Sequence, residues 1–154
     1  MSISIRQIFD KDHKTEICKT ILADIPEWFG IDEANKHYAS YCRNQVFFGA
    51  FDDSIPIGLL TIEFHFSRSA EIYLMGIIKR YHRQGIGRQL VVTAEKYLTA
   101  KEYRLLQVKT LGKSYPDNNY AKTRQFYQSI GFEPVEELIE FWDKLPCLLL
   151  VKTI

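Results

Sequence analysis

Residues 71–98 read EIYLMGIIKRYHRQGIGRQLVVTAEKYL, and this stretch decides the fold. Its first part, Glu71–Ile78, is a short apolar run with β-branched and aromatic members, which is typical of a strand. From Gly87 onward, apolar residues recur at helical spacing and form one stripe. Cationic residues and the triplet Gly85-Ile86-Gly87 lie between the two parts. The stretch therefore predicts a strand, a basic glycine-containing turn and a helix.

The predicted turn has the properties of a phosphate-binding site. The first amides of a helix have no partner within the helix, and the helix dipole adds partial positive charge at the same end. Glycine allows a positive φ and a close approach of the backbone to a ligand. Mobile cations surround the turn, namely Lys79, Arg80, Arg83 and Arg88. We therefore expect a phosphate or pyrophosphate to bind here.

Two common phosphate-binding motifs do not fit the same residues. A Walker loop needs Gly-Lys-Ser/Thr, whereas this chain has Gly87-Arg88-Gln89. A dinucleotide fingerprint needs a third glycine or alanine, but position 90 is Leu90. It also needs an acidic residue at the end of the next strand, which here ends in Val108-Lys109-Thr110. Both motifs are excluded.

Composition indicates an ordinary globular protein that forms one domain, residues 1–154. A net charge of +1 gives no reason to expect nucleic acid or an anionic membrane as a partner. Cys18, Cys42 and Cys147 are far apart without C-x-x-C spacing, so neither a metal site nor a disulfide framework is expected. The strand-like start at Met1–Ile5 predicts no signal peptide, and no apolar run is long enough to span a bilayer. We expect a soluble cytoplasmic protein.

Hydrophobic periodicity and turn residues predict the remaining elements. In chain order they are a strand Ser2–Phe9, a helix capped by Asp12 and ended by Pro26, a helix capped by Asp32, strands Val46–Phe51 and Ile57–Phe66, a strand Leu105–Thr110, a helix that opens at Asn118 with Gly131 at its C-terminus, a strand that begins at Phe132, and a final strand Pro146–Val151. The first four strands are expected to form an antiparallel meander, and the strand at 105–110 to lie parallel to the fourth. This arrangement is an α/β or α+β fold with a central mixed sheet.

Two segments resemble landmarks of the GNAT superfamily of N-acetyltransferases. The segment His82–Gly87 resembles the family motif Gln/Arg-x-x-Gly-x-Gly/Ala, with His82 in place of Gln or Arg. The segment Tyr120–Phe132 resembles a helix that ends in an aromatic-Tyr pair followed by Gly-Phe. The resemblance implies a mostly antiparallel mixed sheet of about seven strands, flanked by about four helices, with a splay between the fourth and fifth strands.

The resemblance also implies acetyl-CoA as the cofactor. Its pyrophosphate would contact the backbone amides of the glycine turn, and its pantetheine arm the diverging strands. The implied cofactor-binding residues are Ile77, Ile78, Lys79, His82, Arg83, Gln84, Gly85, Ile86, Gly87, Arg88, Asn119 and Arg124. The asparagine that contacts pantetheine in the family corresponds to Tyr120, with Asn118 and Asn119 just upstream.

The implied activity is direct transfer of an acetyl group, within a ternary complex, to a primary amine of a small molecule or peptide. Tyr127 is implied to protonate the departing thiolate, and the Ile77 amide to polarise the carbonyl. Free alkyl amines titrate near pH ~10, so a base or a water chain must take the amine proton. Glu71, which matches a catalytic glutamate of some family members, is the first choice, with His65 and Glu63 as alternatives.

By the same resemblance, the acceptor would contact the loop between the first two helices and the carboxyl-terminal hairpin. The residues are Glu27, Trp28, Phe29, Phe141 and Trp142. Trp28 and Phe29 would serve equally well as core residues beneath a loop. A non-catalytic acyl-CoA-binding or regulatory module is the alternative function, and the same aromatic surfaces are compatible with a homodimer.

Overall fold

The computed structural model describes residues 2–154, so Met1 of the predicted domain lies outside the described residues. The strands form one seven-stranded sheet in the order β1-β2-β3-β4-β5-β7-β6. They are β1 (Ile3–Ile8), β2 (Val46–Asp52), β3 (Ile55–Phe66), β4 (Ser69–Ile77), β5 (Leu105–Leu111), β6 (Glu133–Trp142) and β7 (Leu145–Thr153). The helices are α1 (Lys11–Asp24), α2 (Asp32–Tyr41), α3 (Ile86–Ala100) and α4 (Asn118–Ser129), with 3-10 turns at Cys42–Asn44 and Lys79–Tyr81.

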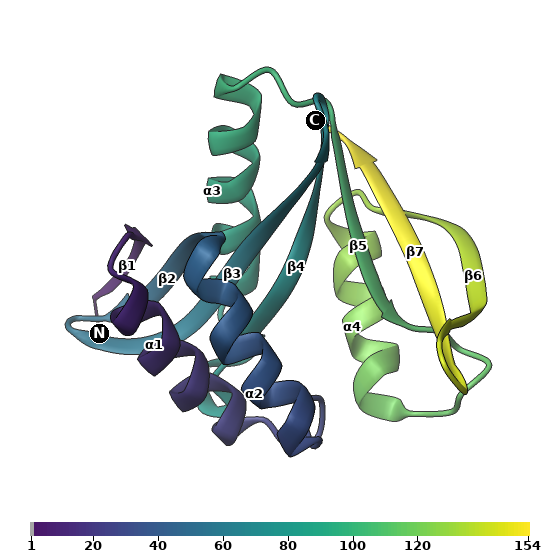
Figure 1. Ribbon diagram of the computed structural model, residues 1–154, viewed down its shortest axis with the longest axis horizontal. Coiled ribbons are helices and arrows are strands. Elements are labelled where there is room, and N and C mark those ends of the chain that lie inside the picture. Colours follow the sequence, from purple (N-terminus) through teal and green to yellow (C-terminus); the bar gives the residue numbers. More distant parts are fainter. Residues whose placement is uncertain (1) are drawn as a thin grey trace.

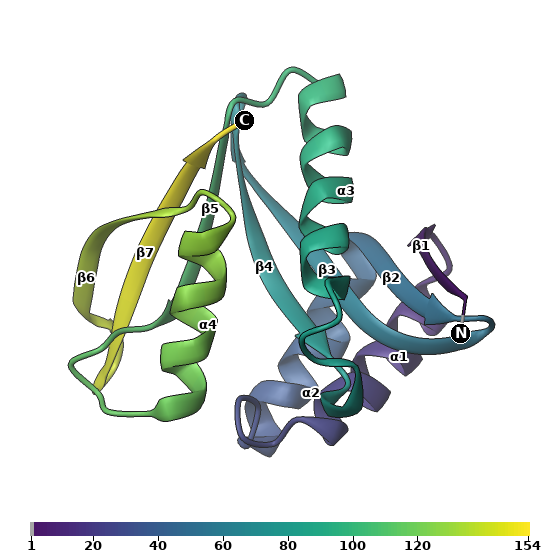
Figure 2. The same cartoon turned by 180° about the vertical axis from the view of Figure 1, so that it is seen from behind.

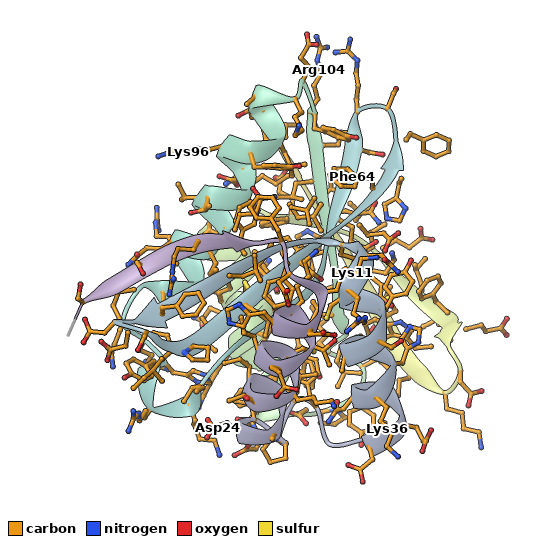
Figure 3. The ribbon with its side chains drawn as sticks, turned by 60° about the vertical axis from the view of Figure 1, so that its left-hand side comes forward. Lys11, Asp24, Lys36, Phe64, Lys96 and Arg104 are labelled. Carbon is orange, nitrogen blue, oxygen red and sulfur yellow. The ribbon has the colours of Figure 1, made fainter. Side chains whose placement is uncertain are left out.

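The predicted topology is confirmed. Strands β1 to β4 pair successively and antiparallel, and α3 returns the chain so that β5 lies parallel to β4. Helices α1 and α2 cover one face of the β1–β4 half of the sheet, and α3 covers the opposite face of the same half (Figures 1 and 2). Helix α4 packs beside β5. Figure 3 brings the α1–α2 face forward, with Lys11 and Asp24 at the two ends of α1 and Lys36 on α2.

The splay between β4 and β5 is the feature that opens the sheet. The two strands pair only from Ser69, opposite Leu105, to Ile72, opposite Val108. Beyond Ile72 they diverge, and the gap widens toward the end of β4 (Figure 1). Strand β4 has a bulge at Tyr73, since Ile72 and Leu74 pair with two consecutive residues of β3. The bulge lies at the point where β4 and β5 begin to diverge. A bulge bends its strand and increases the local twist, which turns β4 away from β5.

The predicted apolar stripe of α3 forms the centre of the core on its side of the sheet. Leu90, Val91, Ala94 and Leu98 are almost completely buried, and Tyr97 packs against them at the edge. A second cluster lies under α1 and α2 on the opposite face. The two clusters hold β4 from both sides, so its position is fixed although its edge beyond Ile72 has no neighbouring strand.

Two predicted helix caps are wrong by one or two residues. Asp10, in an extended conformation, caps α1, and its carboxylate accepts a hydrogen bond of 2.8 Å from the His13 amide. Asp12 lies within the first turn of α1, where its carboxylate pairs with Arg43 at 2.9 Å. Asp32 is likewise the first residue of α2 and not its cap. An acidic residue is favourable at either position, so composition alone does not separate them.

Candidate functional site: a cleft along the splayed strands

The start of α3 offers backbone amides that no side chain caps. Gly85 occupies the N-cap position with φ +80°, and Arg83 also has a positive φ, +62°. A Cβ placed on Gly85 would meet no atom within 4 Å, so the space beside this glycine is open. A Cβ on Gly87 would lie 3.1 Å from the Phe126 ring and 3.2 Å from Ile77 Cδ1. Gly85 therefore provides the turn and the open space, and Gly87 permits close packing.

The four cations predicted around this turn differ in their surroundings. Lys79 pairs with Glu27, and the guanidinium of Arg80 lies over the ring of Tyr81, 5.1 Å from its centroid. Arg83 and Arg88 line the cleft next to the open helix start. Neither of these two arginines forms an ion pair with a carboxylate among residues 2–154. They are the cations available to an anion at this end.

One cleft of about 1210 Å³ begins at the start of α3 and follows the gap between β4 and β5. It brings together most of the residues singled out from the sequence. Those that line it are Trp28, Phe29, Glu63, His65, Glu71, Ile77, His82, Arg83, Gly85, Ile86, Gly87, Arg88, Tyr127, Phe141 and Trp142. The two distant sequence landmarks and the two aromatic segments thus converge on a single space.

Six predicted contact residues lie outside the cleft lining, namely Glu27, Ile78, Lys79, Gln84, Asn119 and Arg124. Polar groups of several of them are used within the protein. Gln84 donates a hydrogen bond to the Arg80 carbonyl, and Arg124 donates one of 2.7 Å to the Leu111 carbonyl at the end of β5. The backbone N–H of Asn119 donates a hydrogen bond of 2.9 Å to the carboxylate of the cap residue Asp117. Their proximity in sequence to the two motifs does not bring their side chains into the cleft.

His82, which stands where the family usually has Gln or Arg, stabilises the turn by a hydrogen bond to the end of β4. Its Nε2 lies 2.7 Å from the Ile77 carbonyl oxygen. A carbonyl oxygen only accepts hydrogen bonds, so Nε2 carries the proton and donates it. The indole of Trp28 packs edge-on against the imidazole, with ring centroids 5.5 Å apart.

Trp28 connects the two halves of the molecule across the splay. Its Nε1 donates a hydrogen bond of 3.1 Å to Thr123 Oγ1, and its carbonyl accepts one of 2.7 Å from the Tyr120 hydroxyl. Both partners belong to α4, whereas Trp28 lies in the connection between α1 and α2. Sequence analysis identified Trp28 as a pocket or core residue but missed this bridge. Tyr120, at the position of the family's asparagine, provides half of it.

Tyr127 presents a protonated hydroxyl to the cleft. Its ring packs edge-on against Phe126 and Phe132, at 5.2 and 5.5 Å between centroids, and its side chain is buried. The hydroxyl has no hydrogen-bond partner among the described residues. Burial raises the pKa of Tyr127 well above the usual value for a tyrosine, and the nearby Tyr120 adds to this effect. The group therefore holds its proton at neutral and moderately alkaline pH.

The two leading candidates for the base, Glu71 and His65, are in contact with each other. His65 Nε2 lies 2.6 Å from Glu71 Oε1. Lys109 Nζ lies 2.9 and 3.1 Å from the two oxygens of the same carboxylate, and Gln107 Nε2 lies 3.2 Å from Oε1. Sequence analysis missed Lys109, because its place beside Glu71 depends on the register of β4 and β5. Glu71 is opposite Gln107, and Lys109 follows two residues later on the same face.

The model of the acetyltransferase (GNAT) domain matches residues 43–134, more than half of the chain. The chain belongs to the GNAT acetyltransferase family. A comparison with curated protein sequences finds no match. Within residues 2–154, no helix is long and apolar enough to cross a membrane, and no group of three or more His, Cys, Asp or Glu side chains could hold a metal ion.

Solved GNAT structures share the whole fold at low sequence identity. A GNAT-family protein from Desulfovibrio desulfuricans has a TM-score of 0.83 at 15% identity and covers 99% of both chains. The PaiA N-acetyltransferase from Thermoplasma acidophilum, in complex with coenzyme A, has a TM-score of 0.76 at 20% identity and full coverage of both chains. A GNAT acetyltransferase from Elizabethkingia anophelis with acetyl-CoA bound has a TM-score of 0.76 at 18% identity, covering 99% of this chain and 98% of that one.

Proposed function

We propose that the protein is an acetyl-CoA-dependent N-acetyltransferase that transfers an acetyl group directly to a primary amine of a small molecule or peptide. One observation carries the proposal. The uncapped start of α3, the open edge of β4 and the hydroxyl of Tyr127 all border the same cleft. A phosphate-binding end, a track for an extended chain and a proton donor are the three parts that thioester-dependent transfer requires.

The residues present fit acetyl-CoA. The amides at the start of α3, together with Arg83 and Arg88, suit its pyrophosphate, and the open space beside Gly85 leaves room for it. The backbone groups of β4 beyond Ile72 have no neighbouring strand on the β5 side, so they suit the amides of a pantetheine arm. The coenzyme A and acetyl-CoA complexes of the two GNAT structures above are consistent with this assignment. The bound cofactor would supply the acetyl thioester.

We assign the two proton transfers to Tyr127 and His65. The Tyr127 hydroxyl holds the proton that the departing thiolate needs. Because the Glu71 carboxylate can only accept from His65, Nε2 of a neutral His65 carries the proton, and Nδ1 retains the lone pair that can accept the amine proton. Both oxygens of Glu71 contact Lys109, so we regard Glu71 as the residue that orients His65 and not as the base itself.

An assay of thiol release from acetyl-CoA over a panel of primary amines tests the proposal. At least one amine is expected to accelerate thiol release and to be recovered as its N-acetyl derivative. His65→Gln should lower kcat by about 100-fold, the usual contribution of a general base. His13→Gln, in an exposed position on α1 outside the cleft, is the matched control and should leave kcat unchanged. Binding of acetyl-CoA without acetylation of any amine would favour the non-catalytic alternative.

A further inference from the structure

An aromatic wall lines the cleft where α2 faces β4. We use this name for the rings of Phe29, Tyr38, Tyr73 and Tyr41, all of which line the cleft. Successive ring centroids are 5.8 Å apart for Phe29 and Tyr38, 6.0 Å for Tyr38 and Tyr73, and 5.1 Å for Tyr73 and Tyr41. Aromatic faces attract cations because the ring quadrupole is negative at its face.

Glu63 adds a negative charge beside the outer end of this wall. The Tyr41 hydroxyl donates a hydrogen bond of 3.1 Å to Glu63 Oε1, and Gln45 Nε2 donates one of 2.9 Å to Oε2. Both donors are neutral, and no cationic side chain among residues 2–154 forms an ion pair with Glu63. Glu63 also lines the cleft, so its charge is available to a ligand.

The other charged groups of the cleft leave this region negative. Glu63 and Glu71 are directly opposite each other in the β3–β4 register, so both carboxylates lie at the same level of the sheet. Lys109 is committed to Glu71, and its side chain is only 16% exposed. Arg83 and Arg88 lie at the other end of the cleft, next to the start of α3. One carboxylate therefore remains without a balancing charge beside the aromatic wall.

The pKa values of two tyrosines in the wall are raised, in part by the same carboxylates. The pKa of Tyr73 is raised to about 12, mainly by burial, then by the neighbouring Tyr38 and Tyr41, and after these by the charges of Glu63 and Glu71. The pKa of Tyr41 is raised chiefly by its hydrogen bond to Glu63. Burial disfavours any charge, but the carboxylates of Glu63 and Glu71 also favour a cation at this place.

We propose that the acceptor carries a second, non-reacting ammonium group, which binds against Tyr41 and Tyr73 beside Glu63. This inference rests on the proposed function and specifies its substrate class as a short-chain diamine or an equivalent amine. Glu63 lies opposite Glu71, and His65, at a bulge of β3, contacts the Glu71 carboxylate, so both side chains lie on the same face of the sheet. Two residues of extended strand span at most about 7 Å. A chain of a few methylene groups spans this distance, with one amine at His65 and the other at Glu63.

The test compares two acceptors that differ only in the second charge. In 1,4-diaminobutane an ammonium group replaces the terminal methyl group of n-pentylamine. We expect kcat/KM to be about tenfold higher for the diamine, which corresponds to about 1.4 kcal/mol. Glu63→Gln should remove this preference. Glu33→Gln, which removes the same charge from a side chain that is 88% exposed on α2, is the matched control and should retain it.

A binding measurement separates this inference from the proposed function. The melting temperature of the protein with coenzyme A is measured with each amine, for the wild type and both variants. If the diamine raises the melting temperature more than n-pentylamine does, and only Glu63→Gln loses this difference, the subsite is supported. If, in addition, neither amine is acetylated, the transferase proposal fails while the subsite stands. Equal kcat/KM values for the two amines overturn the subsite. Where neither amine is acetylated, equal melting temperatures with the two amines overturn it. Retention of thermal stabilisation by acetyl-CoA shows that Glu63→Gln is folded.

Discussion

At the scale of single residues, Tyr127 gives the sharpest test of the chemistry. Tyr127→Phe keeps the ring that packs against Phe126 and Phe132 and removes only the hydroxyl. We expect kcat to fall by about 100-fold, as for the loss of a general acid. The KM for acetyl-CoA should stay within about twofold of the wild type, because we assign the pyrophosphate contacts to the start of α3. Steady-state kinetics of thiol release measure both constants.

Tyr97 provides the control for this substitution. It is a packed tyrosine on α3 that meets Phe48 and lies outside the cleft, so Tyr97→Phe should leave kcat unchanged. An unchanged kcat in Tyr127→Phe would show that another group protonates the thiolate. A rise in the KM for acetyl-CoA without a fall in kcat would assign Tyr127 a binding role only.

Residue identities were easier to predict than residue contacts. The sequence identified Glu71 and His65 as alternative bases, but the contact between them depends on the β3–β4 hairpin, which brings Phe64 opposite Ala70. Lys109 could be placed beside Glu71 only once the register of β4 and β5 was known. A residue pattern along the chain does not encode register directly, so the ion pair was missed.

At the scale of elements, the start of α3 is the part where conformation and the proposed cofactor binding are most closely linked. Gly85→Ala places a Cβ on a residue with φ +80°, which costs about 1–2 kcal/mol of stability for an L-residue in the left-handed region. The new methyl group would meet no protein atom within 4 Å, but it would project into the space that we assign to the pyrophosphate. We therefore expect the KM for acetyl-CoA to rise about tenfold.

Gly131→Ala separates the two effects. Gly131 has φ +103° at the end of α4, so this variant should lose stability in the same way. Gly131 lies outside the cleft lining, so the KM of Gly131→Ala for acetyl-CoA should match that of the wild type. Equal KM values in the two variants, measured alongside urea unfolding, would show that the start of α3 does not bind the cofactor.

Elements with a strong local signal were predicted well. Gly85 was expected in the turn before α3 and Gly131 at the C-terminus of α4, and both lie there with a positive φ. The meander and the parallel crossover followed from short connections and from the amphipathic stripe of α3. The bridge from Trp28 to α4 was beyond reach, because it joins residues 95 positions apart whose proximity depends on the whole fold. Long-range side-chain contacts of this kind have no local pattern.

At the scale of the whole molecule, buried and half-buried tyrosines make the stability of the fold sensitive to alkaline pH. Burial is the main cause that raises the pKa of Tyr73 to about 12 and that of Tyr120 to about 12, and it raises the pKa of Tyr127 further. In the unfolded chain these groups ionise near pH ~10. Above that pH the unfolded state binds fewer protons than the folded state, so the free energy of unfolding decreases as pH rises.

Urea unfolding between about pH 8 and about pH 11 measures this dependence. Stability that is fully present below about pH 10 should be lost progressively as the pH rises toward the folded-state pKa values near 12. Tyr73→Phe removes one of the titrating groups and should flatten the curve, whereas Tyr115→Phe, at a position that is 47% exposed, should not. If the three proteins lost stability in parallel, the alkaline sensitivity would have to come from groups other than Tyr73. If the wild type showed no loss up to about pH 11, the tyrosines would ionise without opposing the fold, and their hydroxyls would have to be solvated.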